Sequence, residues 1–137
     1  MISKRTAKLI ELLPKPMVKR VAAKYLDWYL NKYADISVVN GDVLKNIKDP
    51  VIFVSNHLSN TDALVLNKVL GAGRVHFVAG VKLTENDLTR LGLDVVKTIP
   101  INPCTADRKA LSCVVKTLKS GQSVHIFPEG TRSRKGS

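Results

Sequence analysis

The sequence predicts an α/β fold in which a mostly parallel central sheet is flanked by helices. Short apolar runs that resemble strands alternate along the chain with longer segments whose apolar residues recur at helical spacing. Several runs are continuously apolar, which is typical of strands covered on both faces. The 137 residues, 45% of them hydrophobic, suffice for one domain with a core. Strands that alternate with helices favour parallel pairing through helical crossovers.

Residues 1–35 form a basic amphipathic segment ahead of that domain. They hold eight Lys and Arg residues against three acids, within a chain whose net charge is +11. A helix is predicted from Pro14 to Tyr33, opening near Pro16. Its apolar stripe consists of Val18, Val21, Ala22, Tyr25, Trp28 and Tyr29. This stripe either packs on the domain or meets a membrane interface, and both can hold. We therefore expect an N-terminal helical segment, 1–35, and a domain at 36–137.

The domain is expected to open with two strands and a helix. Residues 36–42 predict a short strand that ends in an Asn-Gly turn. The apolar run Val51–Val54 predicts a strand buried on both faces. The helix that follows takes Asn60 or Thr61 as its N-cap and stops at Gly71 or Gly73.

The remaining elements continue the alternation. Strands are predicted over 74–80, 95–102 and 123–127, and helices over 84–92 and 105–121. The last helix is expected to be capped by Thr105 and to end at Gly121. The sequence stops ten residues after Phe127 with no closing helix, so we expect the C-terminal part of the fold to be missing.

Two polar clusters follow predicted strands. Asn56, His57 and Asp62 come after the strand at 51–54, and residues 128–135 come after the strand at 123–127. Ligands of α/β sheets bind outside the carboxyl ends of strands. If the two strands lie near each other, the clusters share one crevice.

His57 and Asp62 are the residue types expected for a general base and the carboxylate that orients it. On one continuous helix, residues five apart would lie about 140° apart, so contact requires the chain to turn between them. A strand–loop–helix path supplies that turn. Asp62 could then hold one imidazole nitrogen and leave the other to accept a hydroxyl proton. The alternative is that Asp62 complements a helix N-terminus and His57 lies in a polar loop.

The second cluster suits an anion. Gly130 allows backbone N–H groups to approach a ligand, and Arg132 offers a planar fork for a phosphate. The alternative is a solvated basic tail. His76 and His125 lie inside predicted strands and are interpreted as satisfied sheet histidines without a role. We assign no metal, because no histidine spacing typical of a metal site is present.

Both clusters match motifs of one family. "NHLSNTD" carries an NHx4D motif, and "FPEGTRS" follows it after roughly 70 residues. From about Ile36 to its end, the chain resembles the 1-acyl-sn-glycerol-3-phosphate acyltransferases, which are glycerolipid acyltransferases.

That resemblance implies a reaction. His57 would deprotonate the free hydroxyl of 1-acyl-sn-glycerol-3-phosphate (lysophosphatidic acid), with Asp62 orienting it. The alkoxide would attack the thioester of acyl-CoA or acyl carrier protein directly and yield phosphatidic acid. The phosphate would be bound by a motif that contains Glu129, Gly130, Thr131 and Arg132. No cofactor is implied, and the enzyme would sit peripherally on the anionic cytoplasmic face of the cell membrane without a transmembrane span.

The chain departs from the family pattern in two places. The family often has an Asp-Arg pair where this chain has Asn102 and Pro103, so Arg108 is the candidate to replace the phosphate-binding Arg. Family members also continue past "FPEGTRS" with further strands. The alternative function is therefore a truncated, catalytically silent membrane-associated module. A nucleic-acid partner is not expected, since no binding motif accompanies the charge.

Overall fold

The computed structural model describes residues 14–59, 61–81, 92 and 95–133 of the chain. The chain divides into two compact units, Met1–Asp35 and Ile36–Ser137. The first contains α2, Lys15–Tyr33, which confirms the helix predicted from Pro14 to Tyr33. Proline fits the first turn of a helix because the backbone N–H it lacks would have no intrahelical acceptor there.

Aromatic side chains form one face of α2. The rings of Tyr25 and Trp28 lie 5.7 Å apart, and those of Tyr29 and Tyr33 lie 4.9 Å apart. The Lys32 ammonium is 5.1 Å from the centre of the Trp28 ring. Roughly half of each of these aromatic side chains is exposed. Within the described residues, no helix is both long enough and apolar enough to cross a membrane.

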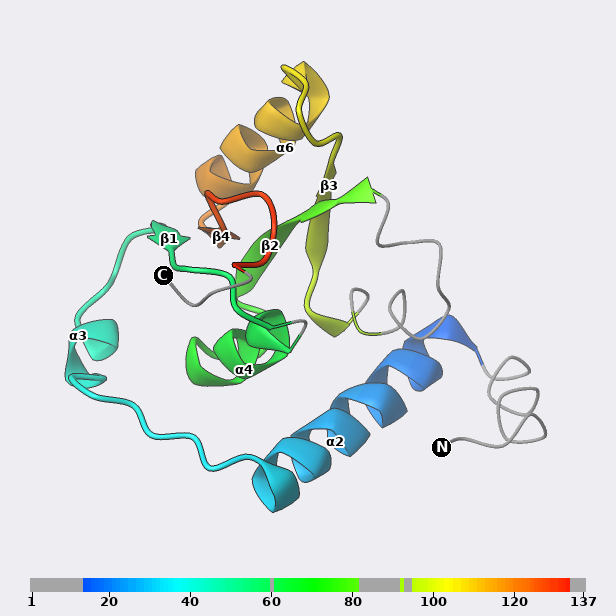
Figure 1. Cartoon of the computed structure of the whole chain (residues 1–137), viewed down its shortest axis with the longest axis vertical. Helices are drawn as coiled ribbons and strands as arrows, with labels where there is room; N and C mark the ends of the chain where they lie inside the picture. The colour runs from blue at the N-terminus through cyan, green and yellow to red at the C-terminus, as the bar shows by residue number, and fades with distance from the viewer. Residues whose placement is uncertain (1–13, 60, 82–91, 93–94, 134–137) are drawn as a thin grey trace. The chain divides into compact units, whose positions relative to one another are not determined.

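The second unit is built on a parallel sheet, which confirms the predicted fold class (Figure 1). Its strands are β1 Ile52–Val54, β2 Val75–Gly80, β3 Thr98–Ile101 and β4 Ser123–Ile126. They are arranged in the order β1-β4-β2-β3, and each neighbouring pair is parallel. The helices described beside them are α3 Asp42–Lys45, α4 Asp62–Val69 and α6 Arg108–Lys119. All four strands therefore have their carboxyl ends at the same end of the sheet.

The two faces of the sheet carry separate apolar clusters. On one face, Val75, Phe77 and Val96 pack against apolar side chains of α4. On the other, Ile99 and Val124 pack with Val114 of α6. Alternate residues of a strand point to opposite faces, so β2 contributes Phe77 to the first cluster and Val78 to the second. The helices hold the strand ends in place from either side.

Two of the predicted strands differ from the structure. Residues 36–42 form no strand: Asn40 adopts a φ of 57° in a turn, and α3 begins directly at Asp42. Val39 is 82% exposed, so the apolar composition of this segment does not lead to burial. Strand β1 is present but lies at the sheet edge, and Ile52 and Val54 are 48% and 63% exposed. The prediction that it is buried on both faces is therefore wrong.

The helices also differ in detail. The N-cap of α6 is Asp107, not Thr105, because the Asp107 carboxylate accepts the Ala110 N–H at 3.0 Å. Thr105 instead donates its hydroxyl to the Asn102 carbonyl. Thr61 is the N-cap of α4, and Gly71 follows the helix with a φ of 93°. Apart from Gly92, the helix predicted over 84–92 lies outside the described residues.

Candidate active site

The loop between β1 and α4 brings His57 and Asp62 into contact. His57 Nδ1 lies 2.9 Å from Asp62 Oδ2. The same carboxylate oxygen accepts the backbone N–H groups of Leu58 and Ser59 at 2.7 and 2.8 Å. Asp62 is the first residue of α4, so its side chain reaches back over the loop that carries His57. The turn expected from the spacing of the two residues is present.

The surroundings of Asp62 keep it ionised and select one form of His57. Burial raises the pKa of Asp62, but the hydrogen bonds from Ser59, His57 and Leu58 outweigh it and hold the pKa below its ordinary value. An ionised carboxylate only accepts hydrogen bonds, so His57 Nδ1 must carry the proton. His57 Nε2 is then left as a proton acceptor.

The second polar cluster meets the first at the backbone of His57. Strands β1 and β4 are neighbours, with Val54 opposite Ile126. The loops that follow them therefore start side by side at the carboxyl end of the sheet. The His57 N–H donates to Glu129 Oε1 at 3.1 Å. The Ser133 N–H donates to the His57 carbonyl at 2.7 Å. The two clusters therefore lie together at the carboxyl ends of β1 and β4, on loops that are hydrogen-bonded to each other.

The residues predicted to bind the phosphate do not all lie equally close to His57. Gly130 has a φ of 64°, and Thr131 and Arg132 are exposed in the loop whose Glu129 contacts His57. Glu129 turns its carboxylate toward a backbone N–H of the other loop. Arg108 begins α6 after β3, at the opposite edge of the sheet. Three strand spacings, about 14 Å, separate the β1 and β3 positions.

Sequence reasoning missed an aromatic contact beneath the catalytic candidate. The His57 ring stacks on Phe127, with ring centres 4.2 Å apart and planes at 21°. Phe127 also contacts His125, which is buried. The interpretation of His76 and His125 as satisfied was wrong, because Nδ1 of each is buried without a hydrogen-bond partner. Period-two alternation in "SVHIF" places His125 and Phe127 on one face and was the available signal.

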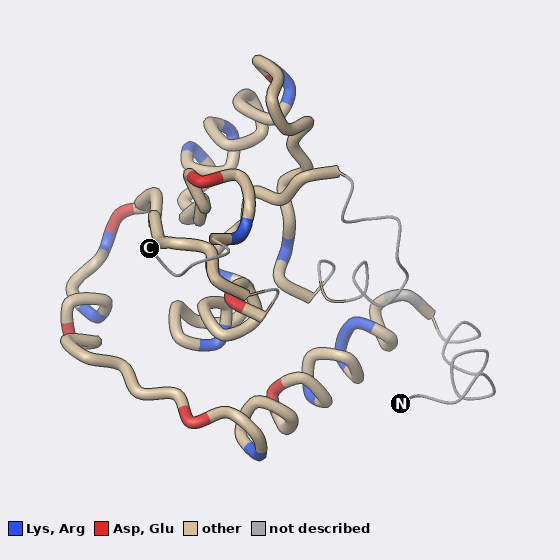
Figure 2. The backbone as a smooth tube through the Cα atoms, in the orientation of Figure 1, with Lys and Arg blue, Asp and Glu red and all other residues tan. Residues whose placement is uncertain are grey.

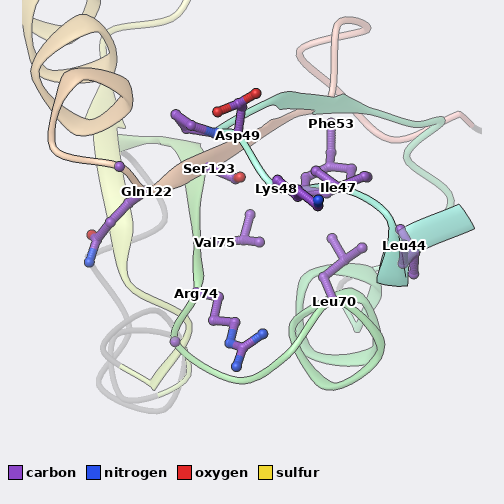
Figure 3. A pocket seen from close by; sticks show the side chains of 13 residues that line it. Leu44, Ile47, Lys48, Asp49, Phe53, Leu70, Arg74, Val75, Gln122 and Ser123 are labelled. Atoms are coloured by element: carbon purple, nitrogen blue, oxygen red, sulfur yellow. The ribbon is translucent and has the colours of Figure 1, made fainter.

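One cavity lies away from His57, at the amino ends of the strands. It has a volume of about 410 Å³ and is lined by residues that precede the strands, among them Pro50, Arg74 and Gln122. Figure 3 shows Lys48, Asp49 and Arg74 around it, with Val75 and Leu70 at its apolar side. These residues mark the amino ends of β1, β2 and β4. Within the described residues, no cluster of three potential metal ligands occurs.

Comparisons with known proteins agree with one another. A family model described as Acyltransferase matches residues 35–137. A probable 1-acyl-sn-glycerol-3-phosphate acyltransferase of Mycoplasma genitalium is 30% identical over 130 residues, covering 87% of this chain and 46% of the relative. The crystal structure of the 1-acyl-sn-glycerophosphate (LPA) acyltransferase PlsC from Thermotoga maritima is similar, with a TM-score of 0.60 and 19% identity. That match covers 96% of this chain and 54% of PlsC, so the chain spans about half the length of either relative.

Proposed function

Because the chain belongs to the acyltransferase family, we propose that it transfers a fatty acyl group from a thioester to the free hydroxyl of 1-acyl-sn-glycerol-3-phosphate. The product is phosphatidic acid. The single observation that carries this proposal is the contact of His57 Nδ1 with Asp62 Oδ2 at 2.9 Å, beside a loop that contains Arg132. A paired base favours a working enzyme over a catalytically silent module of the same family.

His57 is the general base of the proposed reaction. Its Nε2 takes the proton of the acceptor hydroxyl as that oxygen attacks the thioester carbonyl. The new C–O bond forms, the C–S bond breaks, and the departing thiolate recovers the proton from the imidazolium. Ionised Asp62 stabilises that imidazolium while it exists. A base placed in this way contributes about 10²–10⁴-fold in rate.

Arg132 and the loop around it bind the acceptor phosphate in this proposal. Arginine donates two parallel N–H bonds to a phosphate, and Gly130 lets the backbone approach it. Thr131 adds a hydroxyl donor. Glu129 serves the site by holding the loop to the His57 N–H, since a carboxylate repels a phosphate. Arg108, at the start of α6 after β3, is a second and more distant candidate for the phosphate.

The other partners in the proposal are an acyl-CoA or acyl carrier protein and an anionic membrane surface, with no cofactor and no nucleic acid. Figure 2 shows Lys and Arg residues along both α2 and α6. Four of the twelve residues of α6 are basic and none is acidic. A positive surface attracts lysophospholipids and acidic headgroups alike. We place the enzyme peripherally on the cytoplasmic face of the membrane.

Replacement of His57 by alanine tests the proposed function. We expect His57→Ala to lose about 10²–10⁴-fold of the acyl-transfer rate, measured as release of free thiol with lysophosphatidic acid present. The matched control is His76→Ala, which removes a histidine that lies in β2 and should retain activity. Circular dichroism checks that both variants fold. Acyl transfer at the wild-type rate by folded His57→Ala would refute the mechanism.

A further inference from the structure

His125 is the most deeply buried polar side chain among the described residues, and the proposed mechanism does not use it. It lies in β4 and is 1% exposed. Its ring stacks on Phe77 at 5.1 Å and contacts Phe127 at 4.5 Å. A buried imidazole in an apolar cluster is costly unless its polar atoms are bonded. The hydrogen bonds of this ring therefore need an explanation.

The ring has one polar partner, Ser55, in the loop that leads to His57. His125 Nε2 lies 3.1 Å from Ser55 Oγ, and the Ser55 hydroxyl donates to the Asn56 carbonyl at 3.2 Å. A hydroxyl has a single proton, and with that proton on the Asn56 carbonyl Nε2 is the donor to Ser55. The buried Nδ1 is then an unprotonated acceptor, which is the less costly group to leave unpaired. Burial lowers the pKa of His125, and a positive charge on His57, once it is protonated, lowers that pKa further.

This chain of hydrogen bonds ends on the peptide unit that precedes His57. The carbonyl of that peptide, from Asn56, accepts the Ser55 hydroxyl. Its N–H, from His57, donates to Glu129. The peptide is therefore held at both of its polar ends. Phe127 provides a second connection, since it lies against the His125 ring on one side and stacks on the His57 ring at 4.2 Å.

We propose that His125, acting through Ser55 and Phe127, is a positioning residue that sets the orientation of the His57 ring. The inference rests on the proposed function in one respect: the orientation matters because His57 removes the acceptor proton. Small displacements of a catalytic group reduce the rate without weakening substrate binding. His125 touches neither the substrate nor the reacting atoms.

The competing role for His125 is core filling alone, and it makes a different prediction. Phenylalanine fills nearly the same space and keeps the ring contacts with Phe77 and Phe127. It cannot donate to Ser55. Glutamine places an amide N–H near the position of Nε2 and can donate to Ser55 without an aromatic ring. These two substitutions therefore separate the hydrogen bond from the packing.

The test compares kcat and the acceptor KM of four variants. We expect His125→Phe and Ser55→Ala each to lower kcat about 10- to 100-fold with KM nearly unchanged. The double variant should be no slower than either, because both remove the same connection. His125→Gln should recover most of the wild-type kcat. The control His76→Phe alters the neighbouring strand β2, where Nδ1 is also unpartnered, and should leave kcat unchanged.

Two outcomes would overturn the inference. One is a wild-type kcat in folded His125→Phe, which would reduce His125 to core filling. The other is a wild-type kcat in Ser55→Ala, which loses only a hydroxyl and so keeps the test valid if His125→Phe does not fold. Recovery by His125→Gln is the result that packing alone does not produce.

A spectroscopic readout separates this inference from the proposed function. With ¹⁵N-labelled histidine, long-range ¹H–¹⁵N correlation should show His125 protonated at Nε2 and His57 protonated at Nδ1. The His57 Nδ1–H signal should shift in Ser55→Ala and keep its wild-type position in His125→Gln. If the chain shows no acyl transfer while this signal responds as expected, the proposed function fails and the positioning role stands. If acyl transfer occurs and the signal is unchanged in Ser55→Ala, the positioning role is refuted and the proposed function stands.

Discussion

At the scale of single residues, one oxygen atom organises the candidate site. Asp62 Oδ2 receives the ring N–H of His57 and two backbone N–H groups of the loop. These bonds favour the ionised form more than burial disfavours it, so the pKa of Asp62 is lowered on folding. The carboxylate thus couples the protonation of the site to the stability of the loop.

The linkage gives a prediction for acid. Because the folded pKa is lowered, ionised Asp62 adds stability above its ordinary value of 3.8, and that stability is lost as the pH falls through the folded pKa. The free energy of unfolding of the wild type should exceed that of Asp62→Asn at neutral pH. The difference should shrink below about pH 4. Urea denaturation of both proteins across this range measures it, and a difference that stays constant or grows in acid would contradict the assignment.

Two arginines compete for the acceptor phosphate. Arg132 lies in the loop that contacts His57, whereas Arg108 lies at the far strand, so we expect Arg132→Ala to have the larger effect. Loss of a hydrogen bond to a charged group costs about 1.5–3 kcal/mol, which corresponds to a rise of roughly 10- to 100-fold in acceptor KM. Initial rates against lysophosphatidic acid concentration test this. An equal or larger rise of the acceptor KM in Arg108→Ala would indicate that the phosphate binds near β3 instead.

Residue by residue, the sequence predicted the His57–Asp62 contact because only a short turn separates His57 from the first residue of α4. It could not show that Glu129 turns to the His57 N–H, since that bond spans 72 positions and depends on which strands are neighbours. His125 was missed for the same reason. Its partner Ser55 lies 70 positions away, and a histidine within an apolar strand carries no mark of a distant hydroxyl.

At the scale of elements, two glycines flank β4 and permit a matched experiment. Gly121 precedes the strand with a φ of 80°, and Gly130 follows it with a φ of 64°. An added Cβ at either position meets open space, so substitution costs only backbone strain. For an L-residue, that strain is about 1–2 kcal/mol.

Alanine at each position should therefore separate stability from function. We expect Gly121→Ala and Gly130→Ala to lose similar amounts of unfolding free energy, about 1–2 kcal/mol. Only Gly130→Ala should also raise the acceptor KM, because its loop carries Arg132. Denaturation and steady-state assays on both variants measure these effects. A KM increase of the same size in Gly121→Ala would show that the effect is general destabilisation.

Elements with strong local signals were predicted well. The apolar runs of β2, β3 and β4 and the amphipathic pattern of α6 lie where the sequence placed them. The failures concern partners. Residues 36–42 have a strand-like composition but form no strand, and β1 has a buried-strand composition but lies at an edge of the sheet. The cap of α6 was misplaced because Thr105 and Asp107 both suit an N-cap. Asp107 also accepts hydrogen bonds from Asn102, which follows β3.

At the scale of the whole molecule, the net charge of +11 is the property most relevant to a membrane partner. In the proposed membrane association, basic residues attract acidic headgroups and the aromatic face of α2 meets the interface between water and lipid. The two contributions respond differently to salt. Electrostatic attraction is screened, with the Debye length falling from about 10 Å at 0.1 M to about 3 Å at 1 M.

Vesicle sedimentation tests the proposed membrane association. The full chain should bind vesicles that contain an acidic phospholipid more strongly than vesicles of phosphatidylcholine alone. Binding should fall as salt rises, and the remainder at high salt should fall further in Trp28→Ser. Equal binding to both vesicle types, or binding indifferent to salt, would argue against an anionic surface as partner.

The strand order also has a consequence for how the protein is made. β4 is inserted between β1 and β2, although both precede it in the chain. A chain emerging from the ribosome exposes His57 long before residues 123–133, which fill the gap between those strands and bond the His57 backbone. Such distant pairings form late and slowly. The nascent chain therefore contains His57 before the loop that bonds it exists, and the proposed acyl transfer must wait until β4 has been synthesised and folded into place.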